Sequence, residues 1–173
     1  WVEVEDPIYY APNGFYINGD AVSSYGIESE FRFVPSWGSI KLGYSYYVAD
    51  ESGVPAWSTD DSDKAAGLPN HKFTYDVTYQ FKDNWSLNCN GFIGSSRRSW
   101  SDPDGDWTAS PKTWGSEVIT NLYLMHERGP LTLGVGVSDL FNEKQEYAPA
   151  YDNWSGAIPA MSREIFVKAS LEF

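Results

Sequence analysis

The 173-residue sequence has one cysteine, two histidines and few basic residues, and each shortage excludes a class of function. Cys89 alone cannot form an internal disulfide or a zinc site built on paired cysteines. His71 and His126 leave little for metal binding or general-base catalysis, so we expect no enzymatic activity. Twelve basic against 24 acidic residues give a net charge of −12, which repels a nucleic-acid backbone.

Long hydrophobic runs are also missing from the sequence. No stretch approaches the roughly 18 apolar residues that a membrane-spanning helix needs, and no signal peptide opens the chain at Trp1. The chain is nevertheless 42% hydrophobic and 17% aromatic, which a disordered tail would not be. We therefore expect a folded mature or partial product, either one domain or one portion of something larger.

What the sequence has is an alternation of apolar and polar residues with a period of two, which indicates β-strands. The alternation is clearest over 71–83 and recurs over 25–33, 39–48, 85–93 and 164–173. One face of these segments carries no charge, and the charges gather on the opposite face. The expected strands are 1–10, 14–35, 38–50, 69–82, 85–97, 113–127, 130–142 and 161–173, with no helix.

This alternation by itself fits a soluble β-sandwich or soluble barrel as well as a membrane barrel. The lengths of the connections between strands distinguish these folds. Short turns at 35–38, 82–84 and 127–130 alternate with long polar connections at 50–70, 97–113 and 143–162. Tyrosines and tryptophans gather toward the strand ends. Short turns on one side, long loops on the other and two aromatic girdles are typical of outer-membrane barrels. The sequence thus predicts an all-β, antiparallel transmembrane β-barrel of about eight strands.

The C-terminal residues carry a motif with a known counterpart. Ser138-Asp-Leu-Phe-Asn142 closes one expected strand, and after a loop Arg163 opens a last strand that ends in Phe173. This arrangement resembles the end of TonB-dependent outer-membrane receptors, whose Asn-Leu-Phe-Asp element usually has Asn where this chain has Asp139. The stretches 18–33 and 68–81 are similar to further strands of that family.

The resemblance implies that residues 1–173 are the C-terminal section of a larger barrel of about 22 strands, with no plug domain in this chain. It implies a Gram-negative outer-membrane transporter or receptor for a siderophore, cofactor or nutrient. Uptake would be driven through TonB acting on a plug carried elsewhere. An eight-strand section has two unpaired edges, so another chain or segment is expected to supply the plug and the remaining strands. Lipid, lipopolysaccharide and the barrel-insertion machinery are further expected partners.

Two other hypotheses remain open from the sequence. One is a self-contained eight-strand barrel for adhesion or structural interaction, closed by pairing of 1–10 with 161–173. Pro7 and an acidic run make 1–10 a poor closing strand for it. The other is a secreted β-sandwich that binds carbohydrate through its tryptophans.

Several residues are candidates for ligand binding, and each of them also has a simpler structural interpretation. Arg97 and Arg98 suit an anionic ligand such as a ferric siderophore, or else lipopolysaccharide phosphate or neighbouring acidic loops. The loop aromatics suit stacking on a ligand, or else packing of the loops. These aromatics are Trp57, Trp100, Trp107, Tyr147, Tyr151 and Trp154.

Carboxylates and the C-terminal residues complete the candidates. Asp102, Asp104 and Asp106 are spaced by two, which suits Ca²⁺, although the Glu that closes a twelve-residue calcium loop is absent and a solvated acidic turn is the alternative. By resemblance, Phe173 with Val167 and Leu171 forms the signal read by the insertion machinery. No cofactor is expected. The charged residues of the polar face are expected to line a wet interior and to form salt bridges with one another.

Overall fold

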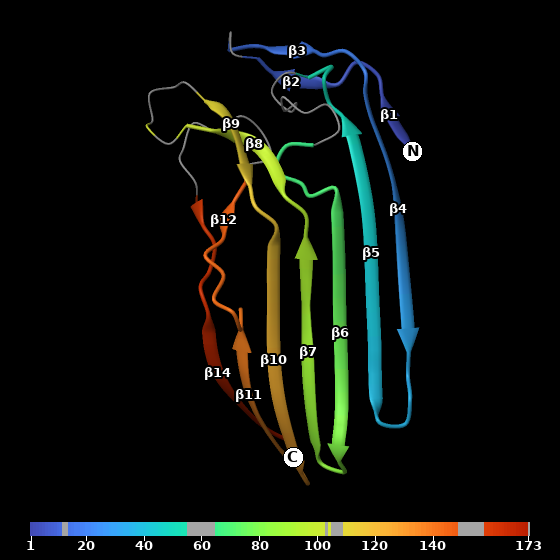
Figure 1. Ribbon diagram of the computed structural model, residues 1–173, viewed down its shortest axis with the longest axis vertical. Coiled ribbons are helices and arrows are strands. Elements are labelled where there is room, and N and C mark those ends of the chain that lie inside the picture. The colour runs from blue at the N-terminus through green and yellow to red at the C-terminus, as the bar shows by residue number, and fades with distance from the viewer. Residues whose placement is uncertain (12–13, 55–64, 103, 105–108, 149–157, 173) are drawn as a thin grey trace.

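The computed structural model describes residues 1–11, 14–54, 65–102, 104, 109–148 and 158–172. Within these ranges every regular element is a β-strand (Figure 1). No described segment forms a helix that is long and apolar enough to cross a membrane. The strands are β1 (Val2–Val4), β2 (Ile8–Tyr10), β3 (Tyr16–Asn18), β4 (Val22–Phe33), β5 (Gly38–Asp50), β6 (His71–Lys82), β7 (Trp85–Gly94), β8 (Arg97–Ser101), β9 (Ser110–Trp114), β10 (Glu117–Arg128), β11 (Leu131–Ser138), β12 (Glu146–Tyr147), β13 (Ile158–Pro159) and β14 (Glu164–Leu171).

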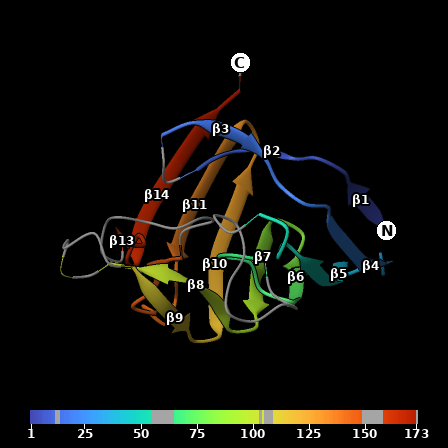
Figure 2. The ribbon, with the colours of Figure 1, turned by 90° about the horizontal axis from the view of Figure 1, so that it is seen from above.

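One antiparallel sheet forms the body of the molecule, in the order β1-β4-β5-β6-β7-β10-β11-β14. Its strands run along the long axis, with tight turns at one end and the long connections at the other (Figure 1). We call these the turn end and the loop end. Three two-stranded hairpins, β2–β3, β8–β9 and β12–β13, lie at or toward the loop end. Figure 2, from above, shows the sheet following a curve.

The sheet is not closed into a cylinder. Among the described residues, β14 pairs only with β11, and β1 pairs only with residues 22–24 of β4. The expected eight strands of the sheet and their antiparallel order are therefore confirmed, and the pairing of 1–10 with 161–173 that a self-contained barrel requires is not formed.

The expected boundaries were wrong at the N-terminus. Residues 1–10 do not form one strand, because Asp6 has a φ of 51° and Pro7 lacks an N–H for the ladder. The chain turns there and continues into the β2–β3 hairpin. The expected strand 14–35 is likewise divided, into β3 and β4. Only the short β1 remains in the sheet.

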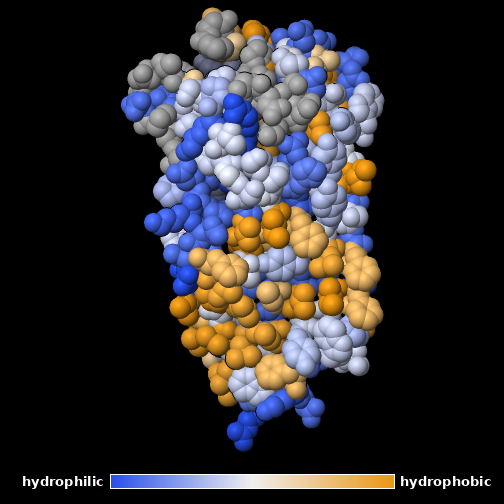
Figure 3. All heavy atoms as spheres, viewed as in Figure 1, coloured by the Kyte–Doolittle hydropathy of each residue, from blue (hydrophilic) through white to orange (hydrophobic). Residues whose placement is uncertain are grey.

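The apolar residues share one face of the sheet across all its central strands. Register pairs Leu42 with Tyr75, Val77 with Cys89, and Cys89 with Leu122. Figure 3 shows hydrophobic residues as an orange band across the lower half of the molecule. Within the described chain no second sheet covers this face, which excludes the β-sandwich hypothesis.

Two hydroxyl groups, those of Tyr75 and Thr120, lie on the apolar face and form a hydrogen bond with each other. The Tyr75 hydroxyl lies 2.5 Å from Thr120 Oγ1 on β10, although β7 stands between the two strands. Gly91 makes this reach possible, because a Cβ at that position would lie 2.7 Å from the Tyr75 hydroxyl oxygen. Hydroxyls that bond to each other are tolerated where water is absent.

Aromatic rings line the turn end on the apolar face. Centroids are 5.7 Å apart for Trp37 and Tyr79, and 6.1 Å for Tyr79 and Phe81. The chain of rings continues from Phe81 to Trp85 at 6.3 Å and from Trp85 to His126 at 4.4 Å. This row runs from the β4–β5 turn across β6, β7 and β10 and matches the expected girdle at that end.

Residues 138–142 end β11 and position the start of β14. Asp139 and Asn142 have φ angles of 50° and 55°, a region that Asp and Asn tolerate better than most residues. Asp139 is buried, and its Oδ1 accepts a hydrogen bond from the Glu143 N–H at 3.1 Å. Asn142 Oδ1 accepts one from the Arg163 N–H at 3.1 Å. The expected strand 130–142 therefore stops at Ser138, because the motif is a turn rather than strand.

Candidate functional site

A row of amide side chains crosses the polar face of the sheet. Asn121 Nδ2 donates to Asn90 Oδ1 at 3.0 Å, and Asn90 Nδ2 donates to Asn88 Oδ1 at 2.7 Å. Asn88 Nδ2 in turn donates to Asp76 Oδ1 at 2.8 Å and to Thr78 Oγ1 at 2.9 Å. This amide ladder joins β10, β7 and β6 and gives the sheet a polar, weakly charged surface.

Charged residues of the same face partly pair with each other, as expected. Lys41 Nζ lies 3.0 Å from Glu30 Oε2, and both side chains are more than half exposed. Lys72 Nζ lies 5.0 Å from the centre of the Phe92 ring. Such exposed contacts contribute little stability and leave the wall able to rearrange.

A hollow of about 540 Å³ lies at the loop end of the polar face. Its lining combines the aromatic side chains of Tyr47 and Phe92 with Lys72, Arg97 and Glu117. It is also lined by residues of β4 near the point where β1 leaves that strand, so part of its boundary is the open edge of the sheet. Aromatic groups beside charges of both signs suit a mixed polar and aromatic ligand.

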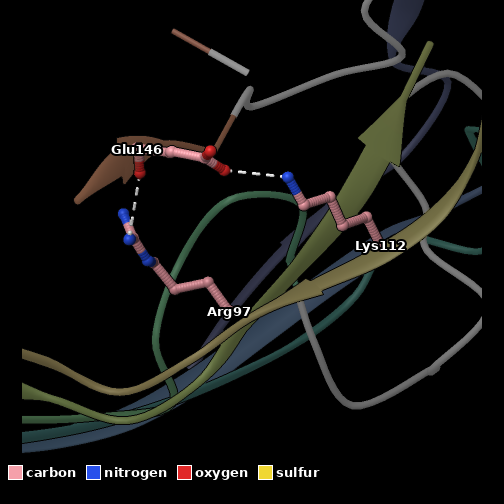
Figure 4. A network of polar contacts seen from close by, with 3 residues as sticks. All are labelled: Arg97, Lys112 and Glu146. Carbon is pink, nitrogen blue, oxygen red and sulfur yellow. Dashed lines mark hydrogen bonds and ion pairs between the residues drawn. The ribbon is translucent and has the colours of Figure 1, made fainter. Parts of the chain in front are cut away.

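Arg97 is held by the protein's own groups at the edge of this hollow. Its Nη1 lies 3.4 Å from Glu117 Oε2, and both side chains are largely buried. Its Nη2 donates to the Glu146 carbonyl oxygen at 3.3 Å (Figure 4). Arg98, the other candidate for an anionic ligand, donates to the Thr113 hydroxyl. The guanidinium of Arg97 therefore neutralises a carboxylate of the wall, and binding of an external anion by either arginine stays a prediction.

A second ion pair fastens the β12 segment to the β8–β9 hairpin. Lys112 Nζ lies 2.8 Å from Glu146 Oε2, and Figure 4 shows Glu146 bridging Arg97 and Lys112. The hydrogen bond from Lys112, followed by its charge and the nearby Trp114 indole, lowers the pKa of Glu146 below its ordinary value against a smaller opposing effect of burial. Burial raises the pKa of Glu51, in the turn after β5. The loop end thus holds carboxylates in unlike environments.

The remaining candidates are scattered rather than gathered into one site. Trp100 lies on β8, partly buried, and Tyr147 on β12 is 56% exposed. Trp57, Trp107, Tyr151 and Trp154 lie outside the described residues. Stacking on a ligand stays a prediction for all of these aromatic residues.

The acidic triplet stays a prediction as a calcium site, because the structure describes only two of its three carboxylates. Asp102 is buried, Asp104 is exposed, and Asp106 is outside the described residues. No group of three or more His, Cys, Asp or Glu side chains that could hold a metal ion occurs among the described residues.

The C-terminal strand shows the pattern expected of an insertion signal. Val167 and Leu171 lie on the apolar face and are 80% and 54% exposed. Phe173 lies outside the described residues. Recognition of this strand by the insertion machinery stays a prediction.

Sequence reasoning missed the amide ladder and the contacts around Glu146. The ladder left a signal, since Asn88 and Asn90 are spaced by two and therefore share a face of β7. Glu146 left none, because its partners Lys112 and Arg97 are 34 and 49 residues away in the sequence.

A family model and several solved structures match the chain. The model described as "TonB dependent receptor-like, beta-barrel" matches residues 1–140. No curated protein sequence matches. The ferripyoverdine receptor of the Pseudomonas aeruginosa outer membrane, solved with ferripyoverdine bound, superposes with a TM-score of 0.77 at 13% identity, covering 99% of this chain and 24% of that one.

Two further structures are similar over nearly all of this chain. The FrpB iron transporter of Neisseria meningitidis has a TM-score of 0.72 at 13% identity, covering 99% of this chain and 28% of its own. The ferric-catecholate import receptor Fiu of Escherichia coli K12 has a TM-score of 0.71 at 22% identity, covering 99% and 24%. At these identities the likeness shows the fold alone. The chain spans about a quarter of the length of these receptors.

Proposed function

Because the chain belongs to the TonB-dependent receptor β-barrel family, we propose that it forms one section of the wall of an outer-membrane receptor that takes up an extracellular ligand. The observation that carries this proposal is an apolar sheet face that no described part of the chain covers, above a girdle of aromatic rings. In the proposal this face contacts lipid, the loop end is extracellular and the turn end is periplasmic.

Unpaired strand edges support the proposal that further strands complete the wall. Residues 25–33 of β4 have a strand neighbour on one side only, as does β14. An unpaired backbone group in lipid costs several kcal/mol, so both edges require partners. We assign these strands, and a plug that meets the polar face, to another chain or segment.

Ligand capture and energy coupling follow from the same arrangement. The hollow at the loop end receives the ligand, and the amide ladder below it provides a polar surface against which a plug can move. Force from TonB acts on the plug. The comparison structures are described as receptors or transporters of iron or ferric siderophores, which supports a ligand of that kind.

Fractionation and electrophoresis test this function. The protein is expressed with its natural neighbours in a Gram-negative host, and the outer membrane is extracted with detergent. We expect the chain in the outer membrane, in a folded particle that contains more strands than its own 19.5 kDa can supply. Refolding of the 173-residue chain alone in detergent as a heat-modifiable monomer contradicts completion by further strands. A chain that is soluble without detergent contradicts the membrane assignment.

A further inference from the structure

A second, smaller hollow lies at the loop end beside the β8–β9 hairpin. It has a volume of about 360 Å³ and is lined by the end of β9, the start of β10 and the segment that leads into β12. Arg97 and Glu117 line both this hollow and the larger one, so their ion pair stands between the two. Trp114, which is 5% exposed, contributes an apolar side to the smaller hollow.

Buried polar atoms without partners converge on this smaller hollow. The Nε of Arg97 and both side-chain amide atoms of Gln145, Nε2 and Oε1, are buried and make no hydrogen bond in the structure. Both residues line the hollow. Buried polar side-chain atoms usually have a partner, because an unsatisfied one loses its bond to water without replacement. The Trp114 indole Nε1 is likewise buried without a partner, so the hollow offers three donors and one acceptor to whatever fills it.

The charges around the hollow cancel. Three cationic and three carboxylate side chains line it. Two cations are already paired, Arg97 with Glu117 and Lys112 with Glu146. The remaining two, Lys144 and Glu143, are exposed and of opposite sign. The buried side of the hollow therefore has no net charge, which favours a neutral ligand. The lining residues with charges are Arg97, Lys112, Lys144, Glu117, Glu143 and Glu146.

We propose that this hollow binds an amide group of a neutral small molecule, with the Gln145 side chain as its recognition group. A primary amide presents a donor beside an acceptor, and the N–H and C=O that flank one Cα of an extended diamide ligand present the same pair in reverse. Two antiparallel hydrogen bonds then satisfy both Gln145 atoms, and Arg97 Nε–H donates to another ligand oxygen. The volume lies within the range of small-molecule pockets. The inference rests on the proposed function, since it names the chemistry of the ligand at the extracellular end.

Binding of a defined probe tests the proposal. The probe is N-acetylalanine methylamide, and its matched analogue is methyl O-acetyllactate, in which ester oxygens replace both N–H groups. Saturation-transfer NMR titrations are run on the assembled receptor purified in detergent. We expect the amide to bind about tenfold more tightly than the diester, since the diester leaves the Gln145 acceptor unpaired.

Variants locate the binding. We expect Gln145→Leu and the isosteric Gln145→Glu each to weaken amide binding about tenfold, because both remove the amide donor. The control Gln80→Leu changes an exposed glutamine on the polar face of β6, near the turn end, and leaves binding unchanged. If Gln145→Leu does not fold, Gln145→Glu and the diester comparison decide the question.

The outcomes separate this inference from the proposed function. Equal binding of amide and diester, undiminished binding by the folded Gln145 variants, or no binding to the wild type, with water alone filling the hollow, overturns the inference. Those results leave the outer-membrane location of the same preparation unaffected. A preparation absent from the outer membrane contradicts the proposed function instead, even where the purified protein still prefers the amide.

Discussion

The loop end and the rest of the sheet differ in how they bury apolar side chains. Within the described residues, every apolar side chain that is fully or almost fully buried lies at the loop end or in the strand ends that lead to it. These residues are Ala11, Val48, Ala49, Val54, Ala65, Ala66 and Trp114. Away from these ends, the long strands contribute none of them. Their apolar residues are half-buried or exposed, and Ile27 is 67% exposed.

The difference shows which part of the molecule is stabilised by contacts within the chain itself. At the loop end, Asp20 N–H donates to the Gly53 carbonyl at 2.9 Å, and Val54 is packed so closely that a Cβ on Gly19 would lie 2.8 Å from its methyl group. Part of the loop end is therefore packed by contacts within the chain, as in a soluble protein. We call the eight-stranded sheet below the loop end the wall. Its strands obtain their backbone hydrogen bonds from neighbouring strands, and both of its faces depend on the surroundings to cover them.

A charge placed on the wall gives the largest expected effect. Val77→Arg puts a guanidinium on the apolar face of β6, and we expect it to destabilise the assembled barrel by about 2–4 kcal/mol in lipid vesicles. Urea titration followed by tryptophan fluorescence measures the loss. The control Thr74→Arg places the same charge on the polar face of the same strand and should cost little. Equal losses for the two variants would contradict the assignment of the faces.

A methyl group placed between strands gives the next largest effect. A Cβ at Gly91 would lie 1.9 Å from the Ile119 carbonyl oxygen, so Gly91→Ala forces β7 and β10 apart. We expect a loss of about 1–3 kcal/mol in the same titration. Gly115, between β9 and β10, has nothing within 4 Å of its Cβ position, and Gly115→Ala should leave stability unchanged. A harmless Gly91→Ala would show that the wall relaxes far more freely than its pairing suggests.

One substitution made in both regions compares them directly. Val54 is completely buried at the loop end, and Val54→Ala leaves a cavity that we expect to cost about 1–2 kcal/mol locally. Val77→Ala in the wall opens a space that lipid chains can fill, so its cost should stay below about 1 kcal/mol. Hydrogen exchange measures the first through the Val54 N–H, which is bonded to the Glu51 carbonyl at 3.0 Å. A larger loss for Val77→Ala would indicate a dry protein environment over the wall.

The wall was predictable from sequence and the loop end was not, for a physical reason. An alternation such as that of Phe73, Tyr75 and Val77 encodes the face of each residue, and short turns force consecutive strands to pair. Both signals are local. They therefore predicted the order of the sheet, its apolar face and the girdle at the turn end.

The loop end depends on contacts between residues far apart in the chain. Arg97 was a candidate for an external anion, yet it lies against Glu117 and the carbonyl of Glu146, and no spacing rule connects these positions. Gln145 attracted no notice, because a lone glutamine in a polar loop looks solvated. Asp139 was identified through a resemblance, and only its backbone conformation explains why the motif ends a strand.

The smallest expected effect is a pH dependence confined to the loop end. The Lys112 hydrogen bond lowers the pKa of Glu146 from its ordinary value of 4.5, so the charged carboxylate is favoured in the folded loop. The resulting stabilisation is fully present above pH 4.5 and is lost as the pH falls through the lowered pKa. Protection of the Ala160 N–H, which bonds to the Gln145 carbonyl at 2.9 Å, should therefore decrease in acid.

Two variants show whether Glu146 causes this dependence. Glu146→Gln cannot ionise, so Ala160 protection should start lower and stay flat across the same pH range. Glu143→Gln leaves Glu146 and Lys112 in place and should keep the decrease seen in the wild type. Amides of β6 and β7 serve as an internal reference, because the wall holds them independently of the loop end. A fall in their protection in parallel with Ala160 would mean that the two regions unfold as one unit.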